Sequence, residues 1–393
     1  MNIEVRGSGG SGGWPAPGCR CASCQRAAAD GRIRAPFRVL VDGVLELSGA
    51  GARGAAEVDG VASGAGLAGG AGYRVRVLAG GWDVTGPDGT RLLAGPRPEV
   101  PAGTAPYDAV LLDLIGDATQ LGWLRARGLV TGGTLVLAGF TDHRVRSERE
   151  LARRCAFWGA TPARDGDVWT VPTAGPTAGP TARSAAGPVA EPGAGPGRPW
   201  RVLVLGGAGS GKSAEAELRL AAEPEVTYVA TGRTDPADPE WTARITTHQA
   251  RRPSWWHTLE STDLAGALTG ARPGGPGAAR GAVLVDSVTA WLAAAMDDCG
   301  AWDTDGAASD RAGPEVGDPV ARLAERTDAL VAAWRQAAGY VVAVSDETGL
   351  GVVPGTRAGR LFRDELGRLN QRLAAEADEF TVVVAGRPLL TAG

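Results

Sequence analysis

The sequence contains almost no lysine. Lys212 is the single lysine, so nearly all of the 40 Lys+Arg side chains are arginine. A bias toward Arg, Ala and Gly codons would produce that skew, and a lysine that survives it is expected to do what arginine cannot. A compact ammonium on a flexible stem reaches into a phosphate cradle where a planar guanidinium fits poorly. We therefore expect Lys212 to contact phosphate.

Other absences exclude whole classes of protein. No apolar run approaches the ~20 residues of a membrane span, and residues 1–5 lack the basic segment and apolar core of a secretory signal. The net charge of -4 gives no electrostatic reason to expect nucleic acid binding. Only five cysteines occur, and the crowding of Cys19, Cys21 and Cys24 favours a metal site in a reducing cytosol over a disulfide framework. We expect a cytoplasmic protein without a membrane span.

Glycine and proline, with 60 and 26 residues, are by contrast abundant and concentrate in a few stretches. The clearest stretch is 173–199, where Thr-Ala-Gly-Pro is repeated and nothing can bury a core, so we predict a flexible linker. This linker separates an N-terminal unit, 1–172, from a C-terminal unit, 200–393. A chain of 393 residues is long enough for two or three domains, each with its own core.

The C-terminal unit alternates short apolar strands with helical patterns. This alternation predicts an α/β fold with a mostly parallel sheet, flanking helices and ligands at the carboxyl ends of the strands. The predicted strands are 201–205, 226–230, 282–285, 339–345 and 380–385. The predicted helices are 214–222, 317–338 and 360–377. We interpret 270–281 and 297–316, which are rich in Gly, Ala and Asp, as surface insertions.

Residues 206–213 have the G-x-x-x-x-G-K-[ST] spacing of a phosphate-binding P-loop between a strand and a helix. Backbone N–H groups in such a turn form an anion site, with Lys212 on the terminal phosphates and Ser213 on Mg²⁺. Asp286, which closes a predicted strand, is the expected second metal ligand. A glycine turn without a ligand, and an N-cap or salt-bridge role for Asp286, are the structural alternatives. The nucleotide-binding residues predicted here are Gly206, Gly207, Ala208, Gly209, Ser210, Gly211, Lys212 and Ser213, with Asp286.

His248 is one of only three histidines, and it closes a helical stretch that begins at Glu240 and precedes Arg251 and Arg252. A neutral imidazole beside a nucleotide α-phosphate can attack it and form a phosphoramidate. Arginines would then balance the phosphate charge. A lone histidine in such a place is more often a surface or capping residue. The spacing alone leaves both interpretations open.

Several blocks occur in order along the C-terminal unit. They are 206–213, Tyr228–Thr231, Glu240–His248 with Arg252 and Pro253, Val285–Ser287, Ser345–Pro354, Arg363–Ala374, and Ala377–Asp378. With these blocks, nearly all of 200–390 resembles the bifunctional adenosylcobinamide kinase/adenosylcobinamide-phosphate guanylyltransferases of cobalamin biosynthesis. The P-loop alone is weak for this family, but the ordered set is highly specific. The resemblance implies a P-loop NTPase-like fold.

The resemblance implies an enzyme with two reactions. A nucleoside triphosphate, ATP or GTP, phosphorylates the aminopropanol hydroxyl of adenosylcobinamide, and GTP then donates GMP to adenosylcobinamide phosphate, giving adenosylcobinamide-GDP and pyrophosphate. A histidine is guanylylated on the way, and His248 occupies its position, so His248 and Lys212 are the implied catalytic residues. Glu260 matches a glutamate implied to contact guanine, with a solvated surface carboxylate as the alternative. The implied assembly is a ring-like homo-oligomer, a trimer.

Four residues depart from the family pattern: Asp346 replaces Asn, Thr348 replaces Val, Gly209 replaces Arg and Thr247 replaces His. A basic phosphate contact is thereby absent at Gly209. Asn370 is one of only two asparagines and falls in the family's Asn-Gln block, near the expected nucleotide or subunit surface. A polar contact near a helix end is its structural alternative. His257 has no matching role and is expected to be a surface or packing residue.

The N-terminal unit opens with a Gly- and Ser-rich stretch and a C-x-C-x-x-C motif over 7–24. It resembles metallo-β-lactamase-fold phosphodiesterases, some of which carry a structural zinc on such cysteines. A fourth Zn²⁺ ligand would be needed, which Cys155 or His143 could supply. Three reduced, unligated cysteines are the alternative. Those hydrolases need a dense H-x-H-x-D-H cluster, which one histidine cannot build. We therefore expect a degenerate, catalytically inactive metallo-β-lactamase-like α/β domain over 1–172.

Within this unit we predict strands over 74–78, 109–114 and 134–138 and a helix over 147–158, whereas 49–72 has no clear period. Two other functions stay open. One is a P-loop regulatory or assembly ATPase that transfers no nucleotide covalently and has the N-terminal unit as its partner module. The other is a zinc-dependent phosphodiesterase acting through 1–172, against which the histidine count argues.

Overall fold

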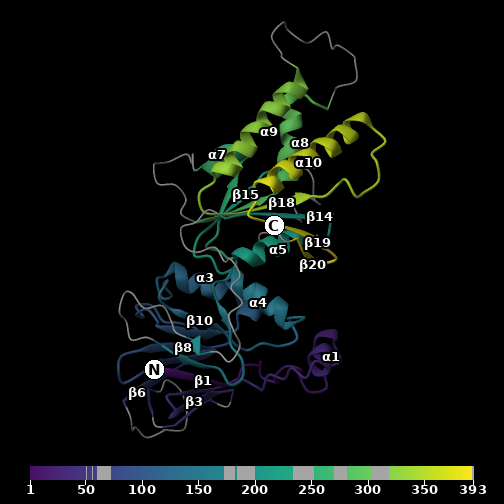
Figure 1. Ribbon diagram of the computed structural model, residues 1–393. Coiled ribbons are helices and arrows are strands. Elements are labelled where there is room, and N and C mark those ends of the chain that lie inside the picture. Colours follow the sequence, from purple (N-terminus) through teal and green to yellow (C-terminus); the bar gives the residue numbers. More distant parts are fainter. Residues whose placement is uncertain are drawn as a thin grey trace. The chain divides into compact units, whose positions relative to one another are not determined.

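The computed structural model describes residues 1–49, 51–54, 56–59, 72–171, 182–183, 200–232, 252–269, 281–302 and 318–391. The chain divides into two compact units, one of Met1–Gly193 with Ala221–Pro224 and one of Ala194–Leu220 with Glu225–Gly393 (Figure 1). Of the predicted linker 173–199, only Ala182–Arg183 is among the described residues. The predicted boundaries 1–172, 173–199 and 200–393 stay predictions.

The N-terminal unit contains an antiparallel sheet of six strands. Its strands, in spatial order, are β13 (Ala182–Arg183), β12 (Val168–Thr170), β1 (Asn2–Gly7), β2 (Arg38–Val41), β3 (Leu45–Ser48) and β4 (Gly51–Gly54). Strands β1 to β3 alternate buried and more exposed residues, as expected when one face of a sheet packs against a core.

A second, mixed sheet of seven strands completes this unit. Its order is β11 (Thr161–Pro162), β10 (Leu135–Ala138), β9 (Ala109–Leu112), β8 (Arg91–Gly95), β7 (Gly81–Thr85), β6 (Tyr73–Leu78) and β5 (Ala56–Asp59). The helices are α1 (Ala22–Ala29), α2 (Leu114–Asp117), α3 (Thr119–Ala126) and α4 (Glu148–Phe157). One apolar core takes side chains from both sheets, including Val39 of β2 and Leu111 of β9, each 0% exposed. The two sheets therefore form a packed pair.

The C-terminal unit is built on one sheet of seven strands. The order is β16 (His257–Glu260), β15 (Val226–Ala230), β17 (Ala282–Asp286), β18 (Tyr340–Asp346), β14 (Trp200–Gly206), β19 (Glu379–Val384) and β20 (Arg387–Thr391). All neighbours are parallel except β19 and β20, which form an antiparallel hairpin. The predicted mostly parallel α/β sheet is confirmed.

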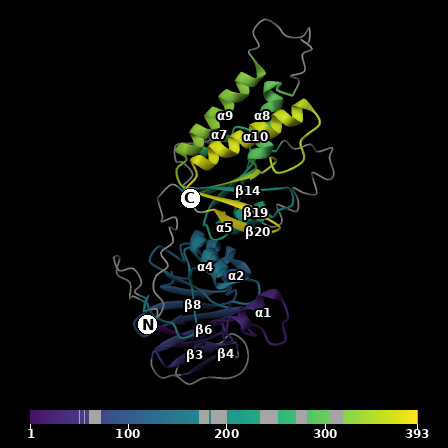
Figure 2. The ribbon, with the colours of Figure 1, turned by 45° about the vertical axis from the view of Figure 1, so that its right-hand side comes forward.

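Helices cover both faces of this sheet. The larger layer holds α7 (Leu264–Thr269), α8 (Val288–Cys299), α9 (Pro319–Gln336) and α10 (Arg357–Ala375), and α5 (Lys212–Leu220) lies on the other face (Figures 1 and 2). Successive residues of β14 enter different cores: Leu203 packs with the larger layer and Val204 packs with α5. Because both faces of the sheet are buried under helices, the strands are continuous apolar runs.

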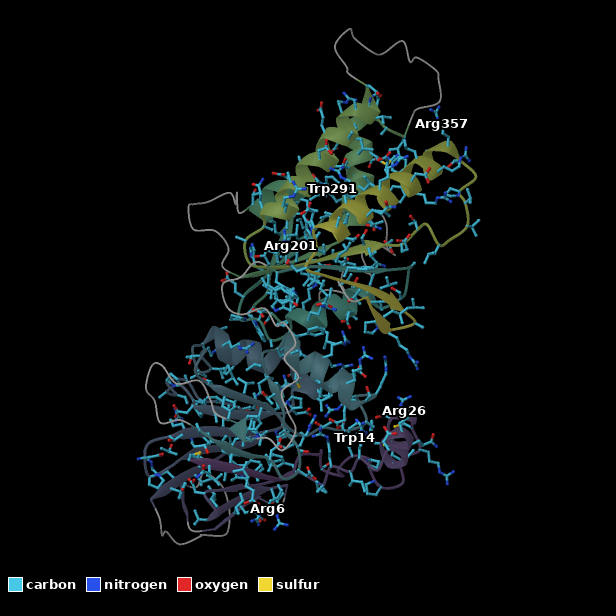
Figure 3. All side chains as sticks on the ribbon, viewed as in Figure 1. Arg6, Trp14, Arg26, Arg201, Trp291 and Arg357 are labelled. Carbon is cyan, nitrogen blue, oxygen red and sulfur yellow. The ribbon has the colours of Figure 1, made fainter. Side chains whose placement is uncertain are left out.

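Two side chains of this unit illustrate its core and its surface. Trp291 of α8 is 3% exposed and lies inside the helical layer, while Arg357 at the start of α10 stands on the surface (Figure 3). Among the described helices, none combines the length and the apolar character that crossing a bilayer requires.

Most predicted elements are present within two or three residues of their expected bounds. The main differences are additional elements. In the N-terminal unit only β6, β9, β10 and α4 were predicted, and in the C-terminal unit β16, β20 and α7 were not. Helix α8 was also missed, and it runs to Cys299, into the segment 297–316 that we interpreted as an insertion. Its apolar side chains, such as Met296 at 0% exposure, belong to the core. Of the two predicted insertions, residues 270–280 and 303–316 lie outside the described residues, whereas Gly281 and residues 297–302 are described.

Candidate functional site

The glycine loop joins the end of β14, at Gly206, to the first residue of α5, Lys212. A Cβ on Gly206 would lie 2.4 Å from Ser210 Oγ and 2.7 Å from the carbonyl oxygen of Val383. Gly209 and Gly211 have φ angles of 67° and 94°, in the left-handed region that favours glycine. The glycines are therefore required by the tight path of the loop.

Two backbone hydrogen bonds hold the loop. The N–H of Ser210 donates to Gly207 O at 3.1 Å, and the N–H of Gly386, in the β19–β20 turn, donates to Ser210 O at 2.8 Å. Gly207, Ala208 and Gly209 are exposed, whereas the Ser210 hydroxyl is buried and has no hydrogen-bond partner among the described residues. An exposed turn ahead of a helix N-terminus, with an unpaired buried hydroxyl beside it, matches an anion cradle.

The ammonium of Lys212 is held at the mouth of this loop. Its Nζ lies 2.7 Å from Asp346 Oδ1 and donates to Gly207 O at 3.3 Å. Asp346 is the last residue of β18, and it pairs in register with Gly206 on the neighbouring strand β14. We predicted phosphate contact for Lys212 but not this partner, because the partner depends on which strands are neighbours.

Asp286 is the last residue of β17 and lies at the same edge of the sheet. The buried hydroxyl of Tyr228 donates to Asp286 Oδ2 at 2.9 Å, and the Arg252 guanidinium lies 3.4 Å from the centre of the Tyr228 ring. Burial and the Asp286 charge both raise the pKa of Tyr228, so the phenol stays a donor. The N-cap alternative for Asp286 is wrong, because Ser287 caps α8 by accepting from the N–H of Ala290 at 3.2 Å.

Asn370 connects α10 to the end of β18. Its Nδ2 donates to the carbonyl oxygen of Asp346 at 3.0 Å, and its Oδ1 accepts from Ser345 Oγ at 2.7 Å. Thr289 Oγ1 accepts from the N–H of Asp346 at 2.8 Å. Asn370 is 3% exposed, so this asparagine positions the β18 terminus beside the loop. Glu347 follows Asp346 in the sequence. It lines a hollow of about 550 Å³ together with residues of α10 such as Arg363.

Glu260 and His248 are the remaining predicted residues of this unit. Glu260 is the exposed last residue of β16, and β15, β17 and β18 separate its strand from β14. Four strand spacings correspond to about 19 Å. His248 lies in 233–251, outside the described residues, as do Glu240, Thr247 and Arg251. The roles predicted for Glu260 and His248 stay predictions, and His257 is an exposed residue at the start of β16.

In the N-terminal unit, the three predicted cysteines meet one histidine. The ligand atoms of Cys19, Cys21, Cys24 and His143 all lie within 4.8 Å of one another, and Cys19 Sγ is 4.0 Å from His143 Nδ1. A tetrahedral Zn²⁺ site with bonds of about 2.0–2.3 Å places neighbouring ligand atoms about 3.5–3.8 Å apart. The four side chains therefore fit a zinc ion after small adjustments.

Local structure brings these ligands together. Cys21 is the N-cap of α1, and its Sγ accepts from the N–H of Cys24 at 3.4 Å. That hydrogen bond lowers the pKa of Cys21, while burial raises the pKa of Cys24 to about 11. Cys155, the other candidate for the fourth ligand, is buried within α4 and is not part of the cluster, which leaves His143.

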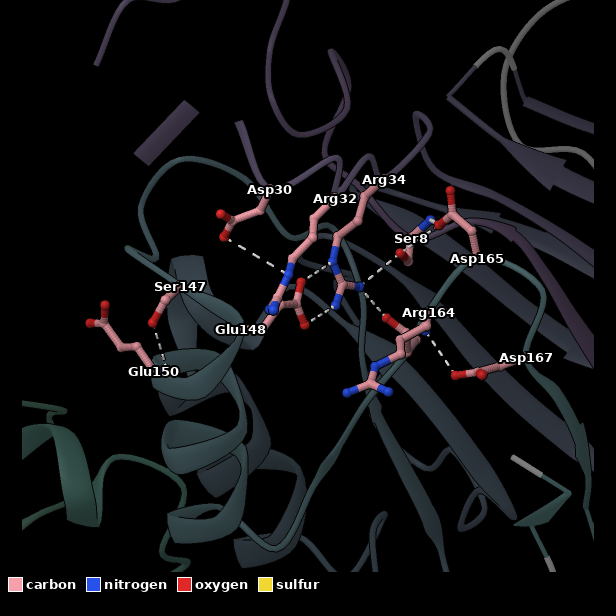
Figure 4. A network of polar contacts seen from close by, with 11 residues as sticks. Ser8, Asp30, Arg32, Arg34, Ser147, Glu148, Glu150, Arg164, Asp165 and Asp167 are labelled. Atoms are coloured by element: carbon pink, nitrogen blue, oxygen red, sulfur yellow. Dashed lines mark hydrogen bonds and ion pairs between the residues drawn. The ribbon is translucent and has the colours of Figure 1, made fainter. Parts of the chain in front are cut away.

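A second polar group of this unit is a buried ion pair (Figure 4). Arg34, 5% exposed, donates through Nε and Nη2 to both Glu148 oxygens at 2.9 and 2.7 Å, and through Nη1 to Ser8 Oγ at 2.9 Å. Asp165 accepts from the N–H and hydroxyl of Ser8 at 2.7 and 2.6 Å. These bonds join the β1 end, the segment before β2 and the first turn of α4, so they hold these three segments together.

The family and the curated relatives that this chain matches concern its C-terminal unit. Residues 202–390 match the family described as cobinamide kinase / cobinamide phosphate guanyltransferase. The bifunctional adenosylcobalamin biosynthesis protein CobU of Salmonella typhimurium is 37% identical over 191 residues, which are 47% of this chain and 96% of that protein. The bifunctional adenosylcobalamin biosynthesis protein CobP of Pseudomonas aeruginosa is 38% identical over 192 residues, 48% of this chain and 95% of that protein.

Among solved structures, Zn(2+)-bound PqqB from Methylobacterium extorquens aligns with 43% of this chain and 99% of its own, at 15% identity and a TM-score of 0.29. At that score the alignment supports no conclusion about fold or function.

Proposed function

Since the chain belongs, through residues 202–390, to the cobinamide kinase / cobinamide phosphate guanyltransferase family, we propose how its residues carry out both reactions. The chain is an enzyme of cobalamin biosynthesis, a kinase and a guanylyltransferase. In the kinase reaction, the hydroxyl of adenosylcobinamide takes the γ-phosphoryl group of ATP or GTP. In the second reaction, GMP passes from GTP to adenosylcobinamide phosphate, giving adenosylcobinamide-GDP and pyrophosphate.

The observation that carries the proposal is the convergence at one sheet edge. The glycine loop and the Lys212 ammonium lie at the carboxyl end of β14, and the Asp286 carboxylate lies at the carboxyl end of β17, two positions away in the same parallel sheet. Ligands of open parallel sheets bind at this edge. The loop residues 206–213 hold the phosphates, and Lys212 neutralises charge on them.

Mg²⁺ fits the donors present, because Ser213 and Asp286 offer the hydroxyl and carboxylate oxygens that this ion prefers. Bound there, the ion would neutralise charge that develops on the phosphate oxygens. The Tyr228 hydroxyl, 2.9 Å from Asp286, orients the carboxylate. Glu260 is proposed to contact the guanine base.

His248 is the proposed nucleophile. Its neutral imidazole nitrogen attacks the α-phosphorus of GTP, a P–N bond forms, and the bond to the β-phosphate oxygen breaks so that pyrophosphate leaves. A phosphate oxygen of adenosylcobinamide phosphate then attacks the same phosphorus, and the imidazole leaves. Both steps conserve the GMP group, and the histidine is regenerated.

The test is covalent labelling with α-³²P GTP. The protein should retain label that is stable in alkali and released in acid, as expected for a phosphoramidate. His248→Ala should abolish labelling, whereas His257→Ala, which removes an exposed histidine of β16, should leave it unchanged. Nucleotide hydrolysis without any label would instead indicate the regulatory or assembly ATPase.

For the N-terminal unit we propose a structural Zn²⁺ on Cys19, Cys21, Cys24 and His143, supported by the cluster of their ligand atoms. The packed pair of sheets supports the proposal that this unit is a degenerate metallo-β-lactamase-like domain. No second histidine is available there, since the other two are His248 and His257. The domain is therefore proposed to be inactive as a hydrolase.

We also propose a cytoplasmic homo-oligomer, a trimer. Apolar side chains on the loop between β18 and α10 support an assembly, because Leu350 and Val352 are 86% and 93% exposed. The matching measurement is the mass of the full chain in solution.

A further inference from the structure

Lys212 of the glycine loop forms an ion pair with Asp346, the last residue of β18. The two atoms, Nζ and Oδ1, are 2.7 Å apart, and the side chains are only 13% and 24% exposed. Such a charge-assisted bond in a partly desolvated place is stronger than a surface pair. The carboxylate therefore acts directly on the one lysine of the chain.

The backbone fixes Asp346 in that place. Its N–H donates to Thr289 Oγ1 at 2.8 Å, and its carbonyl oxygen accepts from Asn370 Nδ2 at 3.0 Å. The N–H of the next residue, Glu347, donates to Gly206 O at 3.2 Å. None of these bonds uses the Asp346 side chain. Its carboxylate is thus aimed at Lys212 without contributing to the anchoring of the strand.

The pair limits what the ammonium can offer to a phosphate. An ammonium has three donors. On Lys212 one of them points to the Asp346 carboxylate, and a second donates to Gly207 O at 3.3 Å. The carboxylate also compensates the positive charge and repels a triphosphate at the same loop. A neutral group in its place would leave the charge of Lys212 fully available.

Resting on the proposed nucleotide site, we propose that Asp346 is a positioning residue that holds Lys212 and lowers the affinity of the glycine loop for triphosphate and pyrophosphate. It acts through the lysine rather than on the reacting atoms. The consequence is a loop that exchanges nucleotide and pyrophosphate readily.

The experiment is equilibrium binding of GTP to the full chain and to Asp346→Asn, with EDTA and with Mg²⁺. The variant should bind GTP about tenfold more tightly in EDTA, as expected for removing one charge at a few ångströms in a partly screened site. This gain should shrink as salt rises. Unchanged or weaker binding would overturn the proposal, and weaker binding confined to Mg²⁺ would identify Asp346 as a metal ligand instead.

Two further variants separate the explanations. In a Lys212→Met background, Asp346→Asn should give a much smaller gain, and an undiminished gain would refute action through the lysine. Asp328→Asn removes a carboxylate that is 69% exposed and paired with Arg372, and it should leave GTP binding unchanged. A wild-type chain that binds no GTP at all would defeat the proposed function itself, whereas binding that ignores Asp346 defeats only this inference.

Discussion

The Tyr228 hydroxyl donates a 2.9 Å hydrogen bond to the Asp286 carboxylate across two neighbouring strands, β15 and β17. Tyr228 is 4% exposed, so its position is set by the core rather than by solvent. The bond fixes the orientation of the carboxylate that we propose as a Mg²⁺ ligand.

Tyr228→Phe should therefore raise the Mg²⁺ concentration needed for half-maximal activity. Loss of an outer-shell hydrogen bond typically weakens metal affinity by about tenfold or more. Activity is measured over a Mg²⁺ titration at saturating nucleotide. Tyr340→Phe, at the opposite end of the same sheet, is the matched control. An identical Mg²⁺ dependence in Tyr228→Phe and wild type would argue against Asp286 as a ligand.

Lys212→Met should weaken GTP binding by about two orders of magnitude, because the cradle loses its mobile ammonium. Lys212→Arg should restore little of the loss, since a guanidinium cannot adopt the same compact contact with Gly207 O and Asp346. Calorimetric titration with GTP measures both. Arg335→Met, which removes one exposed charge paired with Glu376, serves as the control for net charge. Full affinity in Lys212→Arg would contradict the composition argument.

The zinc proposal predicts one Zn²⁺ per chain by elemental analysis of the purified protein. Cys19→Ser and His143→Ala should lose most of the metal, and a chelator should lower the melting temperature of the wild type. Cys155→Ala should keep the metal, because that buried thiol lies outside the cluster. Retention of zinc in Cys19→Ser would show that the metal is bound elsewhere.

Glu148→Ala should destabilise the N-terminal unit by about 3–5 kcal/mol, because it leaves the Arg34 guanidinium buried without its carboxylate. Hydrogen exchange of the full chain, read on peptides of this unit, reports the change locally. Glu46→Ala breaks a surface pair with Arg38, whose side chain is 52% exposed, and should cost less than about 1 kcal/mol. Equal effects of the two variants would show that the buried pair has no special role.

Burial raises the pKa of Asp113 above its ordinary value, although Arg144 opposes this shift from 2.7 Å. The folded state then binds the proton more tightly than the unfolded chain, so this contribution is complete below the unfolded pKa and is lost as pH rises through the folded pKa. Asp113→Asn should remove that part of the pH dependence. Thermal unfolding between pH 4 and pH 7 measures it, with Asp30→Asn, 60% exposed, as control. The same slope in both variants would rule out Asp113 as its source.

Much of the nucleotide site could be predicted because its signals are local. The glycine loop, the strand before it and the helix after it lie within one short segment, and φ angles of 67° and 94° at Gly209 and Gly211 follow from the same spacing. Asp286 could be found because a carboxylate at a strand end is visible in the sequence.

The partner of Lys212 could not be predicted in this way. Asp346 reaches it only because β18 lies directly beside β14, and strand order is set by the packing of the whole sheet. The fourth cysteine-site ligand was undecided for a related reason. Choosing His143 over Cys155 requires knowing which loop approaches α1.

Helix α8 could not be predicted for a different reason. In sequence, an Ala-rich core helix resembles the Ala-rich insertions around it.

The bond from the Gly386 N–H to Ser210 O has a consequence for synthesis on the ribosome. Strand β14 is the first described strand of the C-terminal unit to be translated, yet both neighbours of β14, β18 and β19, are translated much later. The nascent loop therefore lacks its flanking strands and its last backbone restraint until the β19–β20 turn has left the exit tunnel. We therefore expect nucleotide capture by this unit to be a late event, and we expect GTP to give little stabilisation to an intermediate on a ribosome that stalls before residue 386.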